Sequence, residues 1–196
     1  MWDERYTDTD YAYGTEPNDF LVEQAACISG GPVLCLAEGE GRNAVWLARQ
    51  GHVVTAVDAS PVGMDKARRL AAARGVTIET VCSDLAHFMI EPGAWAGVVS
   101  IFAHVPPDLR RALHRRVVEG LRLGGVLLLE AYTPEQLRFG TGGPAVPEMT
   151  MQLALLEEEL DGLEFVLARE LERDVVEGKY HTGRGHVVQL VARKPG

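Results

Sequence analysis

The sequence predicts an α/β fold: one mostly parallel β-sheet with helices on both faces and an antiparallel strand pair at its C-terminal end. The first observation is alternation, because five apolar, strand-like runs between residues 33 and 129 are separated by helix-like segments. Such alternation is typical of parallel sheets covered on both sides. The second is that the last two strand-like runs are joined only by a glycine-containing connection, which suits antiparallel pairing. A length of 196 residues without a repeat or linker predicts a single domain, residues 1–196.

The N-terminal segment, residues 1–20, is predicted to fold over another part of the chain. Its first 14 residues carry four aromatic side chains between acidic and turn-forming residues, namely Trp2, Tyr6, Tyr11 and Tyr13. Disordered tails are poor in aromatic residues, so this segment is expected to pack. A helix is then predicted from about Pro17 to Ser29, because proline favours the first helical turn and the following Gly-Gly-Pro ends the pattern.

The most informative stretch is residues 33–59. An apolar strand is predicted at 33–37, a helix at 42–50 and a second buried strand at 53–57. Gly39 and Gly41 lie in the loop before the helix, where glycine lets a ligand approach the backbone and the helix start offers free N–H groups.

Asp58 follows the second strand, 19 residues after Gly39. A carboxylate at this place accepts hydrogen bonds from both ribose hydroxyls of a bound nucleotide. The stretch therefore predicts a nucleotide-binding unit, and the alternative interpretation is a tight turn followed by a helix-capping aspartate.

After this unit the predicted elements follow in regular order. Ser60 and Pro61 are typical of a helix N-cap and first turn, so a helix is predicted over residues 61–73. A strand rich in β-branched residues then leads to a second acid, Asp84. The remaining predicted elements are strands at 77–81, 95–101 and 126–129, helices at 106–120 and 148–160, a long loop at 133–147, and final strands at 163–176 and 186–193.

Composition and charge narrow the classes of partner. The net charge of −9 disfavours nucleic acid or an anionic membrane as the main partner. No apolar run reaches the roughly 18 residues of a membrane span, and the first residues lack the apolar core of a signal peptide. The three cysteines are far apart and have no metal-ligand spacing. We therefore expect a cytoplasmic protein with reduced thiols and no metal site.

At this point the sequence resembles the class I S-adenosylmethionine-dependent methyltransferases, over nearly its whole length. The resemblance implies a Rossmann-like, doubly wound, seven-stranded sheet, and it is carried by VLCLAEGEGRNAVWLA, VTAVDASPVGMDKAR, SDL at 83–85 and LRLGGVLLLEAYTP. A closer resemblance is to the tellurite-resistance and thiopurine methyltransferase-like branch. It is carried by GEGRNAVWLA, IFAHVPP, YHTGRGHVVQLVARK and the opening WDERY and YGTEPNDFL.

The resemblance implies S-adenosylmethionine as cofactor and S-adenosylhomocysteine as product. Gly39 and Gly41 then pass under the methionine part, Asp58 holds the ribose, and the segment at 1–20 closes over the site. The full set of implied cofactor-binding residues is Tyr13, Glu38, Gly39, Gly41, Asp58, Ala59, Ser60, Asp84, Leu85, Ile101 and Phe102.

The chain departs from the family pattern in the first strand and its loop. Cys35 stands where the family usually has an acid, and Ala37 stands where it usually has glycine. Glu38 and Glu40 add acidic groups to the loop. Cofactor binding that uses Glu38 or water in place of the usual acid is the expectation that follows.

The implied reaction is an in-line displacement, in which the protein aligns the reactants and excludes water. A base is needed only where the attacking group must lose a proton, and a thiolate or a tellurium or selenium oxyanion needs none. His104, after the fourth strand, and His181, between the last strands, are the catalytic candidates. The alternatives are a backbone-bonded histidine for His104 and a polar turn for His181. We expect a small-molecule acceptor and predict no oligomeric state.

Two other functions fit parts of the pattern. Gly39 to Ala44 formally matches the loop of an NAD(P)-dependent oxidoreductase, with Asp58 as its ribose acid. Against this stand Glu38 and Glu40, whose charges would lie near a pyrophosphate, whereas S-adenosylmethionine carries no phosphate. A non-catalytic relative on the same fold is the third hypothesis, because fold does not fix function.

Overall fold

A computed structural model describes residues 2–196 as one seven-stranded sheet in the order β3-β2-β1-β4-β5-β7-β6. The first five strands are parallel, and β7 runs antiparallel to both of its neighbours. The predicted fold class is therefore confirmed. The strands are β1 Pro32–Leu36, β2 Val53–Asp58, β3 Glu79–Cys82, β4 Trp95–Ile101, β5 Leu121–Tyr132, β6 Glu164–Glu177 and β7 His181–Arg193.

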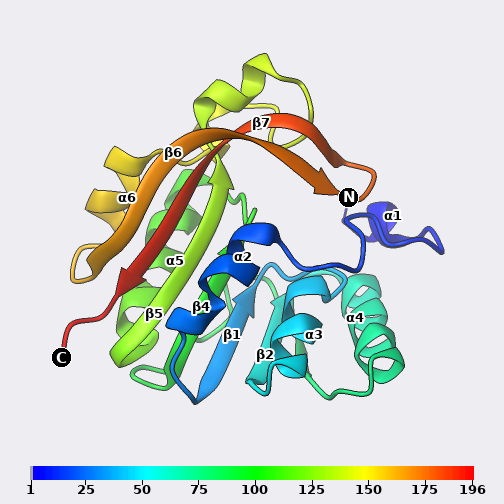
Figure 1. Cartoon of the computed structure of the whole chain (residues 1–196), viewed down its shortest axis with the longest axis horizontal. Coiled ribbons are helices and arrows are strands. Elements are labelled where there is room, and N and C mark those ends of the chain that lie inside the picture. The colour runs from blue at the N-terminus through cyan, green and yellow to red at the C-terminus, as the bar shows by residue number, and fades with distance from the viewer. Residues whose placement is uncertain (1) are drawn as a thin grey trace.

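Helices cover both faces of the sheet (Figure 1). They are α1 Trp2–Tyr6, α2 Asp19–Gln24, α3 Arg42–Arg49, α4 Pro61–Ala73, α5 Pro107–Gly120 and α6 Leu153–Glu159, with 3₁₀ turns at Ala25–Cys27, Pro134–Arg138 and Pro147–Met149. One apolar layer joins α2, α3 and α4 to the sheet, and the other joins α5 and α6 to the opposite face. Alternate strand residues enter opposite layers, as with Cys35 and Leu36 of β1. None of the helices described here is long and apolar enough to cross a membrane.

The helix predicted from Pro17 to Ser29 is shorter in the structure. Asn18 is the N-cap of α2, since its side chain accepts a hydrogen bond from the Leu21 N–H. Pro17 therefore precedes the cap and lies outside the helix. After Gln24 the chain tightens into a 3₁₀ turn and leaves the helix at Ile28.

The helix predicted at 148–160 also begins later, at Leu153. The preceding backbone is used elsewhere, because the Met151 N–H donates to the Tyr132 carbonyl at 2.9 Å. Arg110 of α5 donates to the carbonyl of Thr150 at 3.1 Å. These bonds to β5 and α5 hold residues 150 and 151 in an extended path.

The final strand begins at His181, five residues before its predicted start at 186. His181 is buried and pairs with Glu177 of β6, so its interpretation as a residue of a polar turn was wrong. Two glycines of this strand, Gly183 and Gly185, are closely packed against neighbouring side chains. A Cβ on Gly183 would lie 2.8 Å from Thr141, and one on Gly185 would lie 2.9 Å from Gln136. The β6–β7 hairpin thus extends past the end of β5.

Two smaller differences concern β3 and β5. The strand predicted at 77–81 is β3 at 79–82, displaced by its pairing with β2. The strand predicted at 126–129 is the centre of β5, which begins directly after α5 and continues to Tyr132. The pairing of β5 with β4 shifts register between Trp95 and Gly97 of β4. There the glycine-rich stretch between Leu121 and Val126 of β5 enters the sheet.

Gly41→Ala is expected to destabilise the fold by at least about 2 kcal/mol more than Gly75→Ala. Both glycines have positive φ, 92° and 70°, so both substitutions strain the backbone. Only at Gly41 would the new Cβ overlap a neighbour, at 2.6 Å from the Cβ of Ala67, whereas Gly75 has open space. Urea unfolding of the two variants measures the difference. Equal losses would show that backbone strain, and not the close approach of α3 and α4, fixes this glycine.

Candidate functional site

The sheet changes its winding direction between β1 and β4, and the carboxyl ends of these neighbouring strands form the crevice where open α/β sheets bind ligands. Ala37, directly after β1, and Phe102, directly after β4, have φ angles of 48° and 53°. A left-handed backbone at residues other than glycine costs free energy and is concentrated at functional sites. Two such residues on the two sides of this crevice mark it as the candidate site.

Asp58 and the glycine loop hold each other in place at the crevice. The Gly39 N–H donates to one Asp58 oxygen and the Ser60 N–H donates to the other, each at 2.9 Å. Each carboxylate oxygen keeps a further lone pair for a ligand hydroxyl. Burial raises the pKa of Asp58, and the two N–H groups oppose that rise. Ala59 between them is exposed.

Glu38 serves the start of α3. Its carboxylate accepts hydrogen bonds from the N–H groups of Asn43 and Ala44 at 2.9 and 2.8 Å. This helix has Gly41 as its N-cap, which offers no side chain, so Glu38 supplies the missing acceptor. Cys35, at the usual position of the family acid, lies fully buried in β1, and burial raises the pKa of its thiol.

The other predicted cofactor residues continue along the same edge. Asp84 and Leu85 follow β3, where the Ser83 N–H donates to the Asp58 carbonyl and brings the two acids to neighbouring strand ends. Asp84 is exposed and Leu85 is buried. Ile101 is the last residue of β4 and is 7% exposed.

The N-terminal segment lies over the glycine loop (Figure 1). A Cβ on Gly39 would be 2.7 Å from the Tyr6 hydroxyl, and one on Gly63 would be 3.2 Å from the Tyr6 ring. The Ser60 hydroxyl donates to the carboxylate of Asp3. Burial and the neighbouring Asp58 raise the pKa of Tyr6. Tyr6, which sequence reasoning did not single out as a site residue, is thus the aromatic side chain above the loop.

A buried ion pair fastens this segment. Lys66 of α4 lies 2.5 Å from the Glu40 carboxylate and donates to the carbonyls of Asp8 and Asp10 at 2.9 and 2.7 Å. Glu40 accepts from the Ala12 N–H at 2.7 Å. One lysine and one loop glutamate therefore bind the backbone of the segment at several points.

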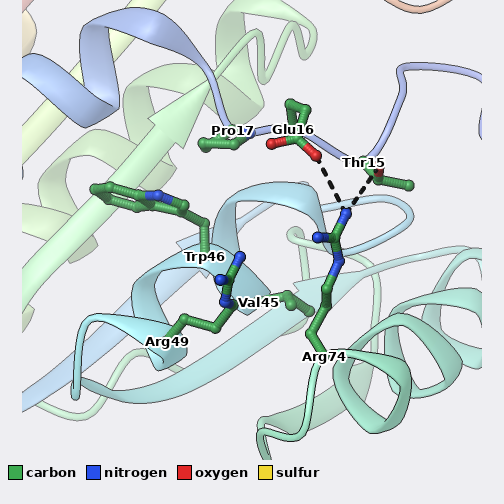
Figure 2. A pocket seen from close by; sticks show the side chains of 7 residues that line it. All are labelled: Thr15, Glu16, Pro17, Val45, Trp46, Arg49 and Arg74. Carbon is green, nitrogen blue, oxygen red and sulfur yellow. Dashed lines mark hydrogen bonds and ion pairs between the residues drawn. The ribbon is translucent and has the colours of Figure 1, made fainter.

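The far end of the segment is fixed on the outer surface of α3 and α4. Arg74 donates to Glu16 at 3.1 Å and to Thr15 at 3.4 Å, as the dashed lines in Figure 2 show. The hollow drawn there, between Trp46 and Arg74, has a volume of about 10 Å³. That is room for about one water molecule, so this hollow is an anchoring contact and not a cofactor site.

An aromatic cluster occupies the other side of the crevice, above β4, β5 and β7. Its rings contact one another with centroid distances of 4.5 Å for Phe102 and Tyr132, 4.6 Å for Tyr13 and His181, 4.9 Å for Phe102 and His181, and 5.8 Å for His104 and Tyr132. The structure therefore brings Tyr13, Phe102 and both candidate histidines together. Tyr13 contacts His181 on this side of the crevice.

His104 has both ring nitrogens engaged by the backbone. Its Nδ1 lies 2.9 Å from the Met149 carbonyl, and its Nε2 lies 3.3 Å from the Tyr132 N–H. The second bond makes Nε2 the acceptor, so Nδ1 carries the proton. Burial lowers the pKa of His104 to about 4, and the ring is neutral. These bonds favour a positioning role, and a catalytic role for His104 stays a prediction.

His181 has a carboxylate as its polar neighbour. Its Nδ1 lies 3.7 Å from Glu177, which also accepts from Arg42 at 2.6 Å and from Asn18 at 2.7 Å. Burial lowers the pKa of His181, and Glu177 opposes that change. Burial also works against the Glu177 charge, but His181 and Arg42 outweigh it and lower the Glu177 pKa to about 2. Glu177 is therefore an anion beside a neutral imidazole near pH 7.

Sequence reasoning missed Glu177, Arg42 and Lys66. Glu177 and His181 are four residues apart, a spacing that a tight hairpin converts into a cross-strand pair, and this was the available signal. Arg42 bonds to Glu177, 135 residues away, and Lys66 pairs with Glu40, 26 residues away. No local sequence pattern indicates such contacts.

No cluster of histidine, cysteine, aspartate and glutamate suited to a metal ion occurs within residues 2–196. The residues present do fit the expected organic cofactor. Asp58 retains acceptor capacity, and the glycine at position 39 presents its backbone without a side chain, beneath the Tyr6 hydroxyl.

Residues 33–125 match the family model described as a methyltransferase domain. The chain is 30% identical over 107 residues to a 2-heptyl-1-hydroxyquinolin-4(1H)-one methyltransferase of Mycobacteroides abscessus, which covers 53% of this chain and 46% of the relative. It is also 36% identical over 93 residues to a carboxy-S-adenosyl-L-methionine synthase of Geobacter metallireducens. That match covers 46% of this chain and 36% of the synthase. The chain thus spans less than half the length of these curated relatives.

Solved structures show the same fold at low identity. TehB from Haemophilus influenzae superimposes with a TM-score of 0.73 at 20% identity, covering 98% of this chain and 65% of that one. A structure from work on the conversion of a disulfide bond into a thioacetal group during echinomycin biosynthesis gives a TM-score of 0.78 at 20% identity, with coverages of 98% and 88%.

The fold is that of the S-adenosylmethionine-dependent methyltransferases. Residues 33–125, just under half of the chain, match a methyltransferase domain, and the cofactor that this match implies is S-adenosylmethionine.

Glu38→Gln is expected to remove a pH dependence of stability. Burial raises the Glu38 pKa from 4.5 to about 7. Between these values the folded protein holds a proton that the unfolded chain has lost, so stability falls as pH rises from about 4.5 to 7, by up to about 3 kcal/mol. Glutamine keeps an oxygen for Asn43 and Ala44 and carries no charge. Urea unfolding at several pH values should show the fall in the wild type and not in the variant; parallel curves would contradict it.

Proposed function

We propose that this protein transfers a methyl group from S-adenosylmethionine to a small-molecule acceptor. The observation that carries the proposal is Asp58, fixed by Gly39 and Ser60 at the β1/β4 crevice of a methyltransferase domain. The bound cofactor supplies an activated methyl group on a sulfonium. Asp58 would hold the ribose, Gly39 and Gly41 would pass under the methionine part, and Asp84 would receive the adenine.

We propose a small acceptor of the soft or chalcogen-bearing kind, a thiol or an oxyanion such as tellurite or selenite. Support comes from the sequence resemblance to the tellurite-resistance branch and from the fold shared with TehB of Haemophilus influenzae. The net charge of −9 disfavours a nucleic-acid acceptor. A cytoplasmic location belongs to the same proposal, on the ground that all three cysteines are free thiols.

The comparisons do not favour the oxidoreductase alternative. The loop carries two carboxylates: Glu38, which caps α3, and Glu40, which pairs with Lys66. In a dinucleotide-binding protein the same loop would lie against a pyrophosphate, and acidic side chains disfavour that anion. The non-catalytic alternative rests on Cys35 and Ala37. Since Glu38 supplies the acceptor for the helix start, these two departures leave the loop intact.

Calorimetric titration should show binding of S-adenosylmethionine and S-adenosylhomocysteine and no binding of NADH. Asp58→Asn should weaken the binding of both sulfur ligands at least about 30-fold, because a charged acceptor for two hydroxyls is lost. Asp161→Asn, on an exposed turn, is the matched control and should bind as the wild type does. Binding of NADH alone, or of none of the three ligands, would refute the proposed function.

We also propose that residues 1–20 close over the bound cofactor, because Tyr6 already lies above Gly39 and Asp3 accepts from the Ser60 hydroxyl. Deletion of residues 1–14 is expected to weaken S-adenosylhomocysteine binding about tenfold or more, because ordered cover over the ligand is lost. Lys179→Ala, which removes the ion pairs from the hairpin tip to Asp8 and Asp10, should raise the dissociation rate. Arg115→Ala, on the far face, is the control. Unchanged affinity after the deletion would refute the lid.

A further inference from the structure

The crevice is chemically divided. The side above β2 and β3 carries the acids Asp58 and Asp84, whereas the side above β4, β5 and β7 carries the aromatic cluster. If the cofactor takes the acidic side, as proposed above, then its methyl group faces the boundary at β1 and β4. The aromatic cluster is then the wall against which the acceptor lies.

Three rings of this wall are close to parallel. Phe102 and Tyr132 are inclined by 29°, and His104 and Tyr132 by 10°. The left-handed backbone at Phe102 places its ring there, and the two backbone bonds of His104 fix the third ring. Parallel rings at a ligand site favour a flat, conjugated ligand.

The wall also contains polar atoms without partners. Among the described residues, the Tyr132 hydroxyl and the His181 Nδ1 make no hydrogen bond. Bulk water does not reach these two atoms either, because Tyr132 is fully buried and His181 is only 8% exposed. Nearly all buried polar groups in native proteins are hydrogen-bonded, so such atoms indicate a ligand or a partner that moves into place. For His181 that partner is Glu177, which is 3.7 Å away.

Glu177 determines which nitrogen of His181 acts. The carboxylate faces Nδ1, and an anion at that position stabilises the tautomer with the proton on Nδ1. Nε2 then keeps the lone pair and is the base. Tyr13, which covers His181 at 4.6 Å, comes from the N-terminal segment, so opening of that segment uncovers the imidazole.

We propose that the acceptor is a planar aromatic molecule bearing a hydroxyl, and that His181, oriented by Glu177, takes the hydroxyl proton during methyl transfer. This rests on the proposed function and adds, beside the soft anions that need no base, a kind of acceptor that does need one. As the new O–CH₃ bond forms, the S–CH₃ bond breaks and its electron pair stays on sulfur. The hydroxyl proton passes to Nε2, and the resulting imidazolium lies beside Glu177 until it releases the proton to water.

The groups facing His181 come from several elements. Glu177 stabilises the imidazolium, whereas Arg42 and Arg5 lower the pKa of His181 after burial, which is the largest cause. Tyr13, Phe102 and Tyr132 surround the ring without charge. The imidazole is therefore neutral and able to accept a proton near pH 7.

A matched pair of acceptors tests this assignment. At a pH of about 8, 2-naphthol keeps its proton while 2-naphthalenethiol of the same shape is already an anion. His181→Gln is expected to slow methylation of 2-naphthol about 100-fold or more and to leave the thiol within about threefold. The variant's rate on 2-naphthol should rise as pH approaches the naphthol pKa, whereas the wild-type rate should stay nearly flat. His52→Gln, directly before β2 and at the amino end of that strand, is the matched control.

A binding experiment is independent of turnover. In the S-adenosylhomocysteine complex, 2-naphthol should bind the wild type, and Phe102→Leu, which keeps an apolar side chain but removes the ring, should weaken it about tenfold. Failure of both naphthalenes to bind this complex at millimolar concentration would overturn the inference, as would equal losses on both acceptors in His181→Gln. Selenite methylation without naphthalene binding would leave the proposed function standing. Absence of cofactor binding would instead remove the proposed function itself.

Discussion

The buried carboxylate of Glu177 joins the parts of the molecule that form the site. Arg42 reaches it from α3, Asn18 from the N-cap of α2, and Arg173 from four residues earlier in β6. Removal of an anion from water is costly unless charge and hydrogen bonds replace the lost hydration, and here several donors do so. Because these donors belong to different elements, the carboxylate fixes the C-terminal hairpin against the helix that follows the glycine loop. The position of His181 is a consequence of that bond network.

The same network explains why the hairpin extends over the crevice. Beyond Tyr132 the strands β6 and β7 pair only with each other, and an unsupported two-stranded ribbon is marginally stable in water. Its far end is held by the bond from the Lys179 N–H to the Ala12 carbonyl and by Arg42 on Glu177. The N-terminal segment is held in turn by Lys66 and Glu40. The two covers of the crevice therefore support each other, and displacement of one weakens the other.

The central unit could be predicted from sequence because its determinants are local. Gly39, Gly41 and Asp58 lie within 20 residues, and the apolar periods on either side identify the strands and helix. The environment of His181 could not be predicted from sequence. The rings and the charge around it belong to Tyr13, Phe102 and Glu177, and the first two are far from it in the chain. The late start of α6 was missed for the same reason: the Met151 N–H bonds to Tyr132, 19 residues earlier. The periodicity of apolar residues indicates which face of a helix is buried. It does not indicate that a distant carbonyl will accept a hydrogen bond from an N–H that the first turn of the helix would otherwise contain.

The glycine loop carries its acid at Glu38, where the carboxylate serves the start of α3. Ala37 is forced into a left-handed conformation, a cost of order 1 kcal/mol that glycine would avoid. The turn at Ala37 carries Glu38 beneath the start of α3, where its carboxylate accepts from two N–H groups that Gly41 cannot serve. Position 35, on the preceding strand, holds a buried cysteine within the apolar layer. Beside these departures, the Gly39 N–H still donates to the Asp58 carboxylate, so the loop and the end of β2 remain joined.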